Sequence, residues 1–366
     1  MKIKLKQAFD LQMGKTPARN QAENWGGNHR WVSIADIGNA EKYIAKTKEC
    51  ITDAGINASG IKVVPQGTVI MSFKLSIGKT AITAQDMYTN EAIIAFIDKK
   101  IFEIDPNYLY HLCCGTDWTA GTNKAVMGLT LNKATLLEKE ISLPDICQQR
   151  KIAAKLDKID AIIADRQQQL TMIEQAVKSR FIELFGDPVS NSYGLPEATL
   201  SDLGEFGRGV SKHRPRNDIK LLGGKYPLIQ TGDVANAGLY ITSYGNTYSE
   251  LGLRQSKMWD KGTLCITIAA NIAKTAILEF DACFPDSVVG FIANERTNNI
   301  FIHYWFSFFQ EILESQAPES AQKNINLKIL SELKVIVPEK RKQDEFASFV
   351  KLTDKSKLWG EMEVAA

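Results

Sequence analysis

The sequence lacks the features that mark several common protein classes. Its 366 residues include six cysteines but no Cys-x-x-Cys pair, and no apolar run reaches the roughly 20 residues of a membrane span. The first ten residues contain no apolar stretch of signal-peptide length. We therefore expect neither a disulfide-stapled secreted domain nor a membrane protein, and scattered cysteines in a chain this long favour a reducing cytoplasm.

Motifs for catalysis are also missing. The chain has no Asn/Asp-Pro-Pro-Tyr/Phe motif, which positions an amino group for methylation, and no Gly-x-Gly-x-x-Gly element for a cofactor. The Pro-Asp pairs at 144–145 and 285–286 are not followed by the Asp/Glu-x-Lys triplet of a metal-dependent nuclease. Residues 111–114 read HLCC, which could suggest metal ligands. The corresponding segment of the second copy, near residue 303, contains no cysteine, so we expect residues 111–114 to form part of a buried helix and not a metal site.

One segment invites a nucleotide-binding interpretation. Residues 67–82 read GTVIMSFKLSIGKTAI and end in Gly-Lys-Thr. A P-loop needs a glycine five positions before that triplet, where this chain has Phe73. The segment returns 195 residues later as GTLCITIAANIAKTAI, with Ala273 in the place of Gly78. We therefore reject the P-loop and interpret the recurrence as a tandem duplication.

Other segments repeat in the same order. NEAIIAFI (90–97) is matched by PDSVVGFI (285–292), and each copy closes with a strand that ends at a proline, Pro144 or Pro338. The sequence therefore predicts an α+β fold with two similar mixed α/β modules, residues 1–144 (the first module) and 187–338 (the second module).

The segment between the copies has a different character. Residues 145–185 contain no Gly or Pro, and their apolar residues alternate at spacings of three and four. We predict a spacer helix over 145–186 that stops at Gly186 and packs antiparallel on a short C-terminal helix, 339–366, with another subunit covering the rest. The expected seam consists of Ile152, Leu156, Ile159, Ile163, Leu170, Ile173 and Val177.

Positive charge gathers where each module begins. The net charge is only +2, but six Lys or Arg lie within residues 1–31 and six within 208–225. Such segments are typical of loops that contact nucleic-acid phosphates, although solvated loops have the same composition. Arginine pairs with guanine and asparagine with adenine. The candidate DNA-binding residues are Lys15, Arg19, Asn20, Asn24, Asn28, His29 and Arg30 in the first module and Arg208, Lys212, His213, Arg214, Arg216 and Asn217 in the second.

Four further candidates lie at the repeated strand phrases. Lys79 and Lys274 occupy matched positions, and we expect them either to hold phosphates or to cover a strand end as structural lysines. The turns before the matched lysines add the last two candidates, Lys74 and Asn271.

Trp25 and Trp31, in the first basic segment, are not candidates for DNA contact. We expect them to pack the base of the first basic loop.

The order of segments resembles the specificity subunit of a type I restriction–modification system. The phrase LPDICQQRKIAAKLDKID, residues 143–160, is similar to the central spacer region of that family. The strand phrases ending in Gly78-Lys79 and Ala273-Lys274 resemble a recurring element of its target recognition domains. The C-terminal helix departs from the pattern because it is shorter than the central one.

This resemblance implies a DNA-binding subunit that is not itself an enzyme. Each module would read one half of a split DNA site, and the spacer helices would dock two methyltransferase (modification) subunits that bind S-adenosylmethionine. A translocating nuclease (restriction) subunit would supply ATP- and Mg²⁺-dependent chemistry, so no cofactor or metal is expected in this chain. Two alternatives stay open: a DNA methyltransferase or nuclease with cryptic motifs, and a protein-binding adaptor that does not recognise DNA.

Overall fold

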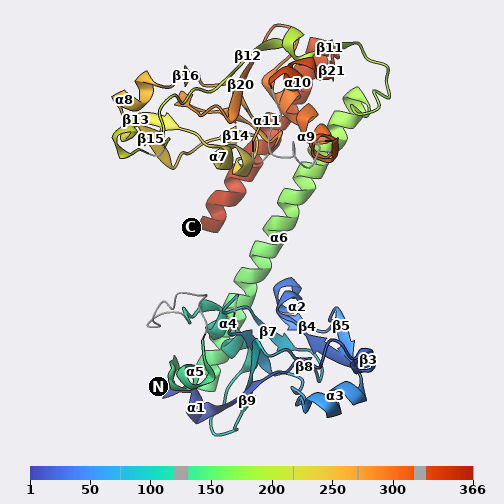
Figure 1. Ribbon diagram of the computed structural model, residues 1–366, viewed down its shortest axis with the longest axis vertical. Coiled ribbons are helices and arrows are strands. Elements are labelled where there is room, and N and C mark those ends of the chain that lie inside the picture. Colours follow the sequence, from blue (N-terminus) through green and yellow to red (C-terminus); the bar gives the residue numbers. More distant parts are fainter. Residues whose placement is uncertain (75, 119–130, 217, 270–271, 317–326, 366) are drawn as a thin grey trace. The chain divides into compact units, whose positions relative to one another are not determined.

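The structure, a computed structural model, describes residues 1–74, 76–118, 131–216, 218–269, 272–316 and 327–365. The chain divides into two compact units, Met1–Ile163 and Ala164–Ala366. The division falls inside the longest helix, so each unit combines one module with part of the spacer. Figure 1 labels many of the elements of both units. Over the described residues, no helix is both long and apolar enough to cross a bilayer.

A five-stranded sheet in the order β2-β9-β6-β7-β4 forms the centre of the first module. Every residue of β6 and β7 is buried, as expected for apolar strands covered on both faces. Neighbouring strands pair antiparallel, except that β4 runs parallel to β7. The bounds are Phe9–Met13 (β2), Tyr43–Ile44 (β4), Val69–Ser72 (β6), Thr80–Thr83 (β7) and Ile93–Asp98 (β9).

Two smaller sheets and short helices complete the first module. Helix α4 packs on β6 and β7 and buries Tyr108, Leu109 and Cys113 against them. The small sheets are β1 (Lys2–Lys4) with β10 (Glu140–Ser142), and β5 (Glu49–Ile51), β3 (Trp25–Val32) and β8 (Tyr88–Thr89). The helices are α1 (Leu5–Ala8), η1 (Ala22–Asn24), α2 (Ile34–Asn39), α3 (Asp53–Ser59), α4 (Pro106–Gly115) and α5 (Lys133–Glu138).

The second module repeats this topology. Its large sheet has the order β12-β20-β17-β18-β14, so each strand occupies the place of its counterpart in the first module. Its small sheet, β15-β13-β19, gains β16 at one edge, and β11 pairs with β21 as β1 pairs with β10. The predicted duplication and mixed α/β architecture are therefore confirmed.

The elements of the second module have these bounds. The strands are β11 (Glu197–Thr199), β12 (Gly204–Arg208), β13 (Leu222–Leu228), β14 (Tyr240–Ile241), β15 (Asn246–Tyr248), β16 (Met258–Trp259), β17 (Leu264–Thr267), β18 (Thr275–Leu278), β19 (Ala282–Cys283), β20 (Val288–Ala293) and β21 (Lys334–Ile336). The helices are η2 (Leu200–Asp202), η3 (Ile219–Leu221), α7 (Thr231–Asn236), α8 (Glu250–Arg254), α9 (Asn299–Gln316) and α10 (Leu327–Glu332).

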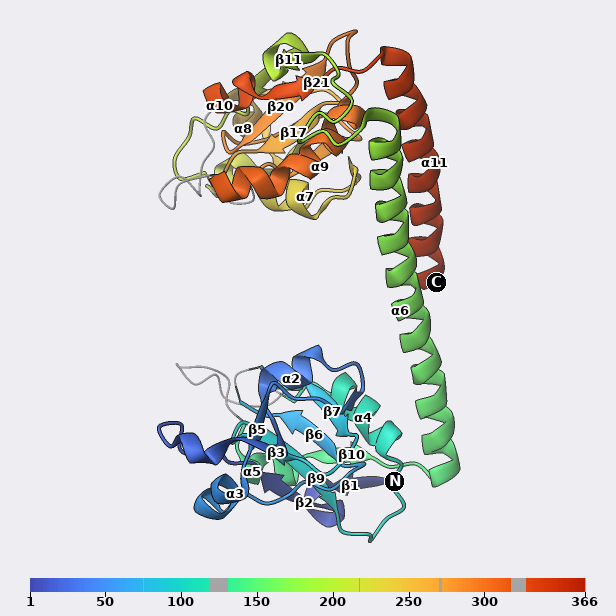
Figure 2. The same cartoon turned by 90° about the vertical axis from the view of Figure 1, so that its right-hand side faces the viewer.

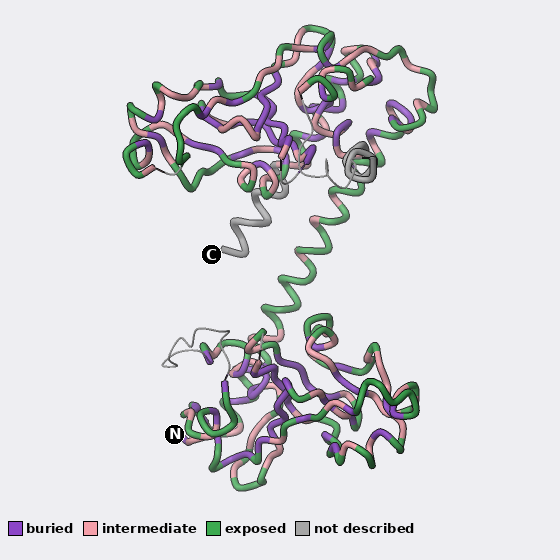
Figure 3. The backbone as a smooth tube through the Cα atoms, viewed as in Figure 1, coloured by how far each residue is buried: buried purple, intermediate pink, exposed green. Residues whose placement is uncertain are grey.

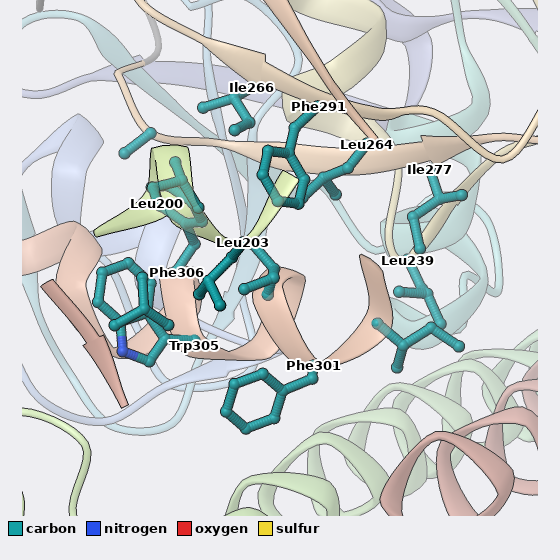
Figure 4. Packing of buried hydrophobic residues seen from close by; sticks show 14 of the residues in the cluster. Leu200, Leu203, Leu239, Leu264, Ile266, Ile277, Phe291, Phe301, Trp305 and Phe306 are labelled. Atoms are coloured by element: carbon teal, nitrogen blue, oxygen red, sulfur yellow. The ribbon is translucent and has the colours of Figure 1, made fainter. Parts of the chain in front are cut away.

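The main core of the second module lies between its large sheet and α9. Figure 4 shows Phe291 of β20 and Leu264 of β17 on one side, and Phe301 and Trp305 of α9 on the other. All four are fully buried. Burying one such side chain contributes about 1.5–3 kcal/mol, so this layer holds α9 firmly on the sheet.

The repeated phrase, Gly-Lys-Thr in the first module and Ala-Lys-Thr in the second, forms the turn between two strands. Gly78 has φ +90° and its N–H donates to Ser72 O at 2.9 Å, while Ala273 has φ +58° and donates to Thr267 O at 2.8 Å. The side-chain hydroxyl of Ser72 accepts the N–H of Lys79 at 3.1 Å, and Thr267 does the same for Lys274 at 3.0 Å. Gly78 therefore adopts the left-handed backbone conformation that the turn requires. A strand, β7, follows this turn, whereas a helix would follow a P-loop.

The spacer is one continuous helix, α6, over Ile146–Phe185, and the C-terminal helix is α11 over Lys340–Ala365. α6 ends as predicted, because Gly186 has φ +75° and its N–H donates to Ile182 O at 2.7 Å. Within the second unit, α11 runs antiparallel beside α6 (Figure 2). Arg180 of α6 pairs with Glu345 of α11 at 2.7 Å.

Candidate nucleic-acid interface

The first basic loop begins where the chain leaves β2 at Gly14. A Cβ at Gly14 would lie 2.0 Å from Thr89 O, so only glycine fits this close backbone approach. Gly209 begins the second basic loop in the same way, since a Cβ there would lie 2.2 Å from Phe284 O. The two basic segments therefore leave equivalent points of the two modules.

Each basic loop ends at a Gly-Gly bulge in the small sheet. Gly26 has φ +83° and Gly223 has φ +78°, and the pairing of β3 and β13 shifts register at these positions. The interval from Gly14 to Gly26 is 12 residues, and from Gly209 to Gly223 it is 14. The loops thus share both ends of their scaffold but differ in length and sequence between them.

Arg19 is exposed, but its side chain is anchored by contacts within the first module. Its Cζ lies 3.9 Å from the ring centroid of Trp25, and its guanidinium donates to both carboxylate oxygens of Glu49 at 2.5 and 3.0 Å. These hydrogen bonds from Arg19 lower the pKa of Glu49, so the pair stays charged in neutral solution. Trp31 is buried and its Nε1 donates to Lys15 O at 3.0 Å. The expectation that the tryptophans pack the loop base is confirmed.

Asn24 is no longer a candidate for DNA contact. It is 1% exposed, and its side-chain amide donates to Ala18 O and Gln21 Oε1 at 3.2 and 3.1 Å. A side chain that is buried and bonded to its own loop cannot meet a base edge. The sequence gives no sign of this, because an asparagine in a polar loop has the same composition whether it faces inward or outward.

Like Arg19, the remaining candidates of the first loop are partly or fully accessible. Asn20 and Asn28 are exposed, and Lys15 donates to Ser59 O at 2.9 Å while staying exposed. His29 Nε2 lies 2.8 Å from Asp53 Oδ1, and Arg30 donates to Cys50 Sγ at 3.6 Å. These five residues lie on the loop and on β3, which it enters.

Acidic residues already pair with several cations of the second loop. Arg216 and Arg214 both contact Asp286, at 2.5 and 3.5 Å, and His213 lies 3.1 Å from Asp218. Hydrogen bonds from the Lys220 N–H and then from His213 lower the pKa of Asp218. All three basic side chains remain exposed, so they are available to phosphates if they exchange their carboxylate partners.

Two cations at the start of the second basic segment differ from these. Arg208, at the end of β12, and Lys212 are exposed, and within the described residues neither forms an ion pair. Nearby, Ser211 Oγ and Gln255 Nε2 are buried without a hydrogen-bond partner in the same described part of the chain. The candidate Asn217 lies outside the described residues.

The matched lysines at the repeated turn differ in exposure. Lys79 is exposed, and its Nζ lies so close to Gly38 of α2 that a Cβ there would be 2.6 Å away. Lys274 is half-buried. Lys74 lies over the ring of Phe73, with its Nζ 5.3 Å from the centroid. Asn271 lies outside the described residues.

A cluster that the sequence did not predict joins α6 to the first module. His111 of α4 contacts Asp157 of α6 at 2.7 Å and Asp160 at 3.8 Å, and the Lys42 ammonium also contacts Asp157. Burial raises the pKa of Asp157, but hydrogen bonds from Lys42 and His111 outweigh it and lower that pKa. One ligand atom from each of His111, Asp157 and Asp160 lies within 4.8 Å of the others. Because Lys42 already supplies a cation there, we interpret the cluster as a contact that docks the helix.

The expected spacer seam is buried only toward its C-terminal end. Val177 is 2% exposed, Leu170 and Ile173 are half-buried, and all three lie in the part of α6 that belongs to the second unit. Leu156 is half-buried in the first unit. Figure 3 shows most of the residues along the middle of α6 as exposed. The exposed seam residues are Ile152 at 40%, Ile159 at 51% and Ile163 at 44%.

A different face of α6 meets the first module. Gln149 and Ala153 are buried there, and Asp157 follows on the same side of the helix. The spacing of apolar residues in the sequence predicts that Ile152, Ile159 and Ile163 share one face of the helix, but it does not predict what covers that face. Those three residues remain uncovered in the first unit. The expectation that another subunit covers the rest of the seam stays a prediction.

Comparisons with known proteins agree on one family. A family model described as type I restriction modification DNA specificity domain matches residues 1–175 and 196–358. The MjaIX type I restriction enzyme specificity subunit of Methanocaldococcus jannaschii is 26% identical over 274 residues, which cover 70% of this chain and 62% of that protein. The putative MjaX specificity subunit of the same organism is 23% identical over 239 residues, covering 63% and 56%.

Solved structures share the fold. The crystal structure of a type I restriction–modification S subunit from M. genitalium has a TM-score of 0.56 at 15% identity, covering 100% of this chain and 92% of that one. A chain from a structural study of complex assembly and conformational transition in a type I system has a TM-score of 0.55 at 16% identity, with coverage of 100% and 93%.

Proposed function

We propose that this chain, which belongs to the type I restriction modification DNA specificity family, is the subunit that reads a bipartite DNA site. The observation that carries this proposal is the pair of basic loops that leave equivalent glycines, Gly14 and Gly209, on two modules of one topology. A duplicated scaffold with different loops is suited to reading two different sequences, because positioning and base readout are separate tasks.

The charge on the loops supports DNA as the target. Lys15, Arg208 and Lys212 are exposed cations suited to phosphates, and Asn20 and Asn28 are exposed amides suited to base edges. Arginines that pair with carboxylates in the free protein would exchange those partners for phosphate oxygens. We therefore place the DNA-contacting surface on the two loops, the adjoining parts of β3 and β12, and the matched lysines Lys79 and Lys274.

The chain would act with partner subunits and carry no catalytic site of its own. Two methyltransferase subunits would bring S-adenosylmethionine, and a translocating nuclease subunit would use ATP and Mg²⁺. The uncovered apolar face at Ile152, Ile159 and Ile163 is where we propose that a methyltransferase subunit docks. The six cysteines are free thiols, which agrees with the cytoplasmic location we propose.

The methylation pattern of a cell tests this function. The chain is expressed with its partner subunits, and modified adenines are mapped by sequencing. We expect two short half-sites separated by a fixed gap. Methylation at a continuous site, or turnover by the chain without partners, would contradict the proposal and favour an enzyme. Partner assembly without any DNA binding would favour an adaptor.

A further inference from the structure

A buried glutamine lies in the first turn of each spacer helix. Gln149 follows Pro144 by five positions at the start of α6, and Gln343 follows Pro338 by five at the start of α11. They are 1% and 0% exposed. We call these two residues the helix-start glutamines. A buried amide needs partners for its hydrogen-bonding groups, so its contacts reveal what the helix is attached to.

Gln149 is bonded on three sides to the first module. Its Nε2 donates to Glu103 O and to Pro144 O, both at 2.9 Å, and its Oε1 accepts the N–H of Asp105 at 2.9 Å. Both amide hydrogens are therefore used. Asp105 also caps α4, since its Oδ1 accepts the N–H of Asn107 at 2.9 Å. The glutamine thus ties the first turn of α6 to the segment that starts α4.

Gln343 makes the same three contacts in the second module. Its Nε2 donates to Arg296 O at 3.0 Å and to Pro338 O at 2.8 Å, and its Oε1 accepts the hydroxyl of Thr297 at 2.9 Å. Asn298 follows at once and caps α9 by accepting the N–H of Phe301 at 2.8 Å. Only the donor to Oε1 has changed, from a backbone N–H to a hydroxyl. The duplication has kept this attachment although the sequences around it differ.

Three directional bonds fix the rotation of a helix in a way that apolar packing does not. On the same face the buried apolar neighbour of Gln149 is the small Ala153, and the charged contacts of Asp157 follow about two turns further along α6. One residue step turns an α-helix by about 100°. One base pair turns B-DNA by about 34°, since a helical turn holds roughly 10.5 base pairs. A helix rotation of a third of one residue step is therefore comparable to the rotation between neighbouring base pairs.

We propose that the helix-start glutamines are positioning residues that set the gap at which the two half-sites are read. Each fixes the rotation of its spacer helix on its own module, and α6 is the segment through which the chain passes from one unit to the other. The inference rests on the proposed function, because a gap preference has meaning only for a bipartite site.

The test measures gap selectivity separately from half-site affinity. The full chain, in complex with its partner subunits, is titrated with duplexes that keep both half-sites and vary the gap by one or two base pairs. Wild type is expected to prefer one gap by roughly tenfold or more, the order of one mismatched position. Gln149→Met keeps the volume but removes all three bonds, and we expect it to reduce the preference to below about threefold. Binding to a duplex with one half-site should stay within twofold of wild type.

The neighbouring Gln148→Met is the matched control. Gln148 is exposed on the same turn, so its substitution should leave the gap profile unchanged. Gln149→Glu offers a second variant that keeps the shape and the acceptor to Asp105 but loses both donors, and Gln343→Met tests the other attachment independently. Melting curves report whether each variant is folded.

The outcomes separate the inference from the function beneath it. If folded Gln149→Met and Gln343→Met keep the wild-type gap profile, the glutamines do not set the gap and the inference is overturned. Equal loss with Gln148→Met would also overturn it. If wild type binds no bipartite duplex at all, the proposed function itself fails.

Discussion

The two modules share one topology but hold α6 by different chemistry. The first module uses charge: Lys42 and His111 both contact Asp157. The second uses aromatic rings: Phe181 and Phe185 of α6 are fully buried, and Phe181 stacks on Phe301 of α9 with centroids 5.3 Å apart. Duplication has therefore kept the buried glutamine and the strand order while the packing around them diverged. An aromatic contact keeps its strength in salt and acid, and a charged contact does not.

The largest effect is expected from removing an aromatic ring at the second attachment. Phe346 of α11 is fully buried and meets Phe181 and Phe185 edge-on at 5.3 and 5.8 Å. We expect Phe346→Ala to lower the free energy of unfolding by about 3–5 kcal/mol, through lost burial and the cavity left behind. Denaturant unfolding measures the loss, and hydrogen exchange should place it in residues 164–365.

The neighbouring exposed Ile182 supplies the control. It is 43% exposed on α6, next to Phe181, so Ile182→Ala should cost well under 1 kcal/mol. An equal loss of exchange protection in the first unit after Phe346→Ala would show that the two attachments are not independent.

The repeated turn offers a reciprocal exchange between the modules. Gly78 and Ala273 share a left-handed backbone, and a Cβ at Gly78 would come no closer than 3.6 Å to Trp118. We expect Gly78→Ala to destabilise by about 1–2 kcal/mol from backbone strain, and Ala273→Gly to stabilise by up to about 1 kcal/mol. Thermal melting measures both shifts. Shifts of the same sign would contradict the assignment of strain to Ala273.

The charged attachment should respond to pH and salt. Asp157 has a lowered pKa in the folded chain, so its contribution is present above the ordinary carboxyl pKa and is lost as pH falls through the lowered pKa. Because Asp157 is 42% exposed, Asp157→Asn should cost only about 1 kcal/mol at neutral pH. Hydrogen exchange in residues 146–160 should rise in the variant, and in wild type at high salt. Asp160→Asn is the control, since its contact to His111 is longer, at 3.8 Å.

The sequence predicts the parts of this fold that depend on local pattern and recurrence. The offset of 195 residues gives the duplication, and the absence of Gly and Pro from 145 to 185 gives α6 nearly to the residue. It does not predict the contact of Lys42 with Asp157, because 115 residues separate them and no periodicity relates them. The same holds for Arg216, whose partner Asp286 lies 70 residues away.

Burial explains why the candidate DNA-binding residues were less predictable than the fold. Asn24 and Asn28 belong to one polar stretch, yet the first is buried and the second exposed. The helix-start glutamines show the converse, because a glutamine among charged residues at a helix start reads as a surface residue. Side-chain direction in a loop or first turn is decided by tertiary contacts, which composition does not record.

The smallest effect per residue is expected from the matched lysines, and it decides between the two interpretations given to them. If Lys79 and Lys274 hold phosphates, changing both to alanine should lower affinity for every DNA sequence and reduce the slope of log affinity against log salt by about 2. Lys79 lies against the last turn of α2, where carbonyl groups favour a cation, so a structural role has a physical basis as well. In that case the slope would not move, and the loss would appear in melting. Single variants sharpen the comparison: the exposed Lys79 should change the slope more than the half-buried Lys274.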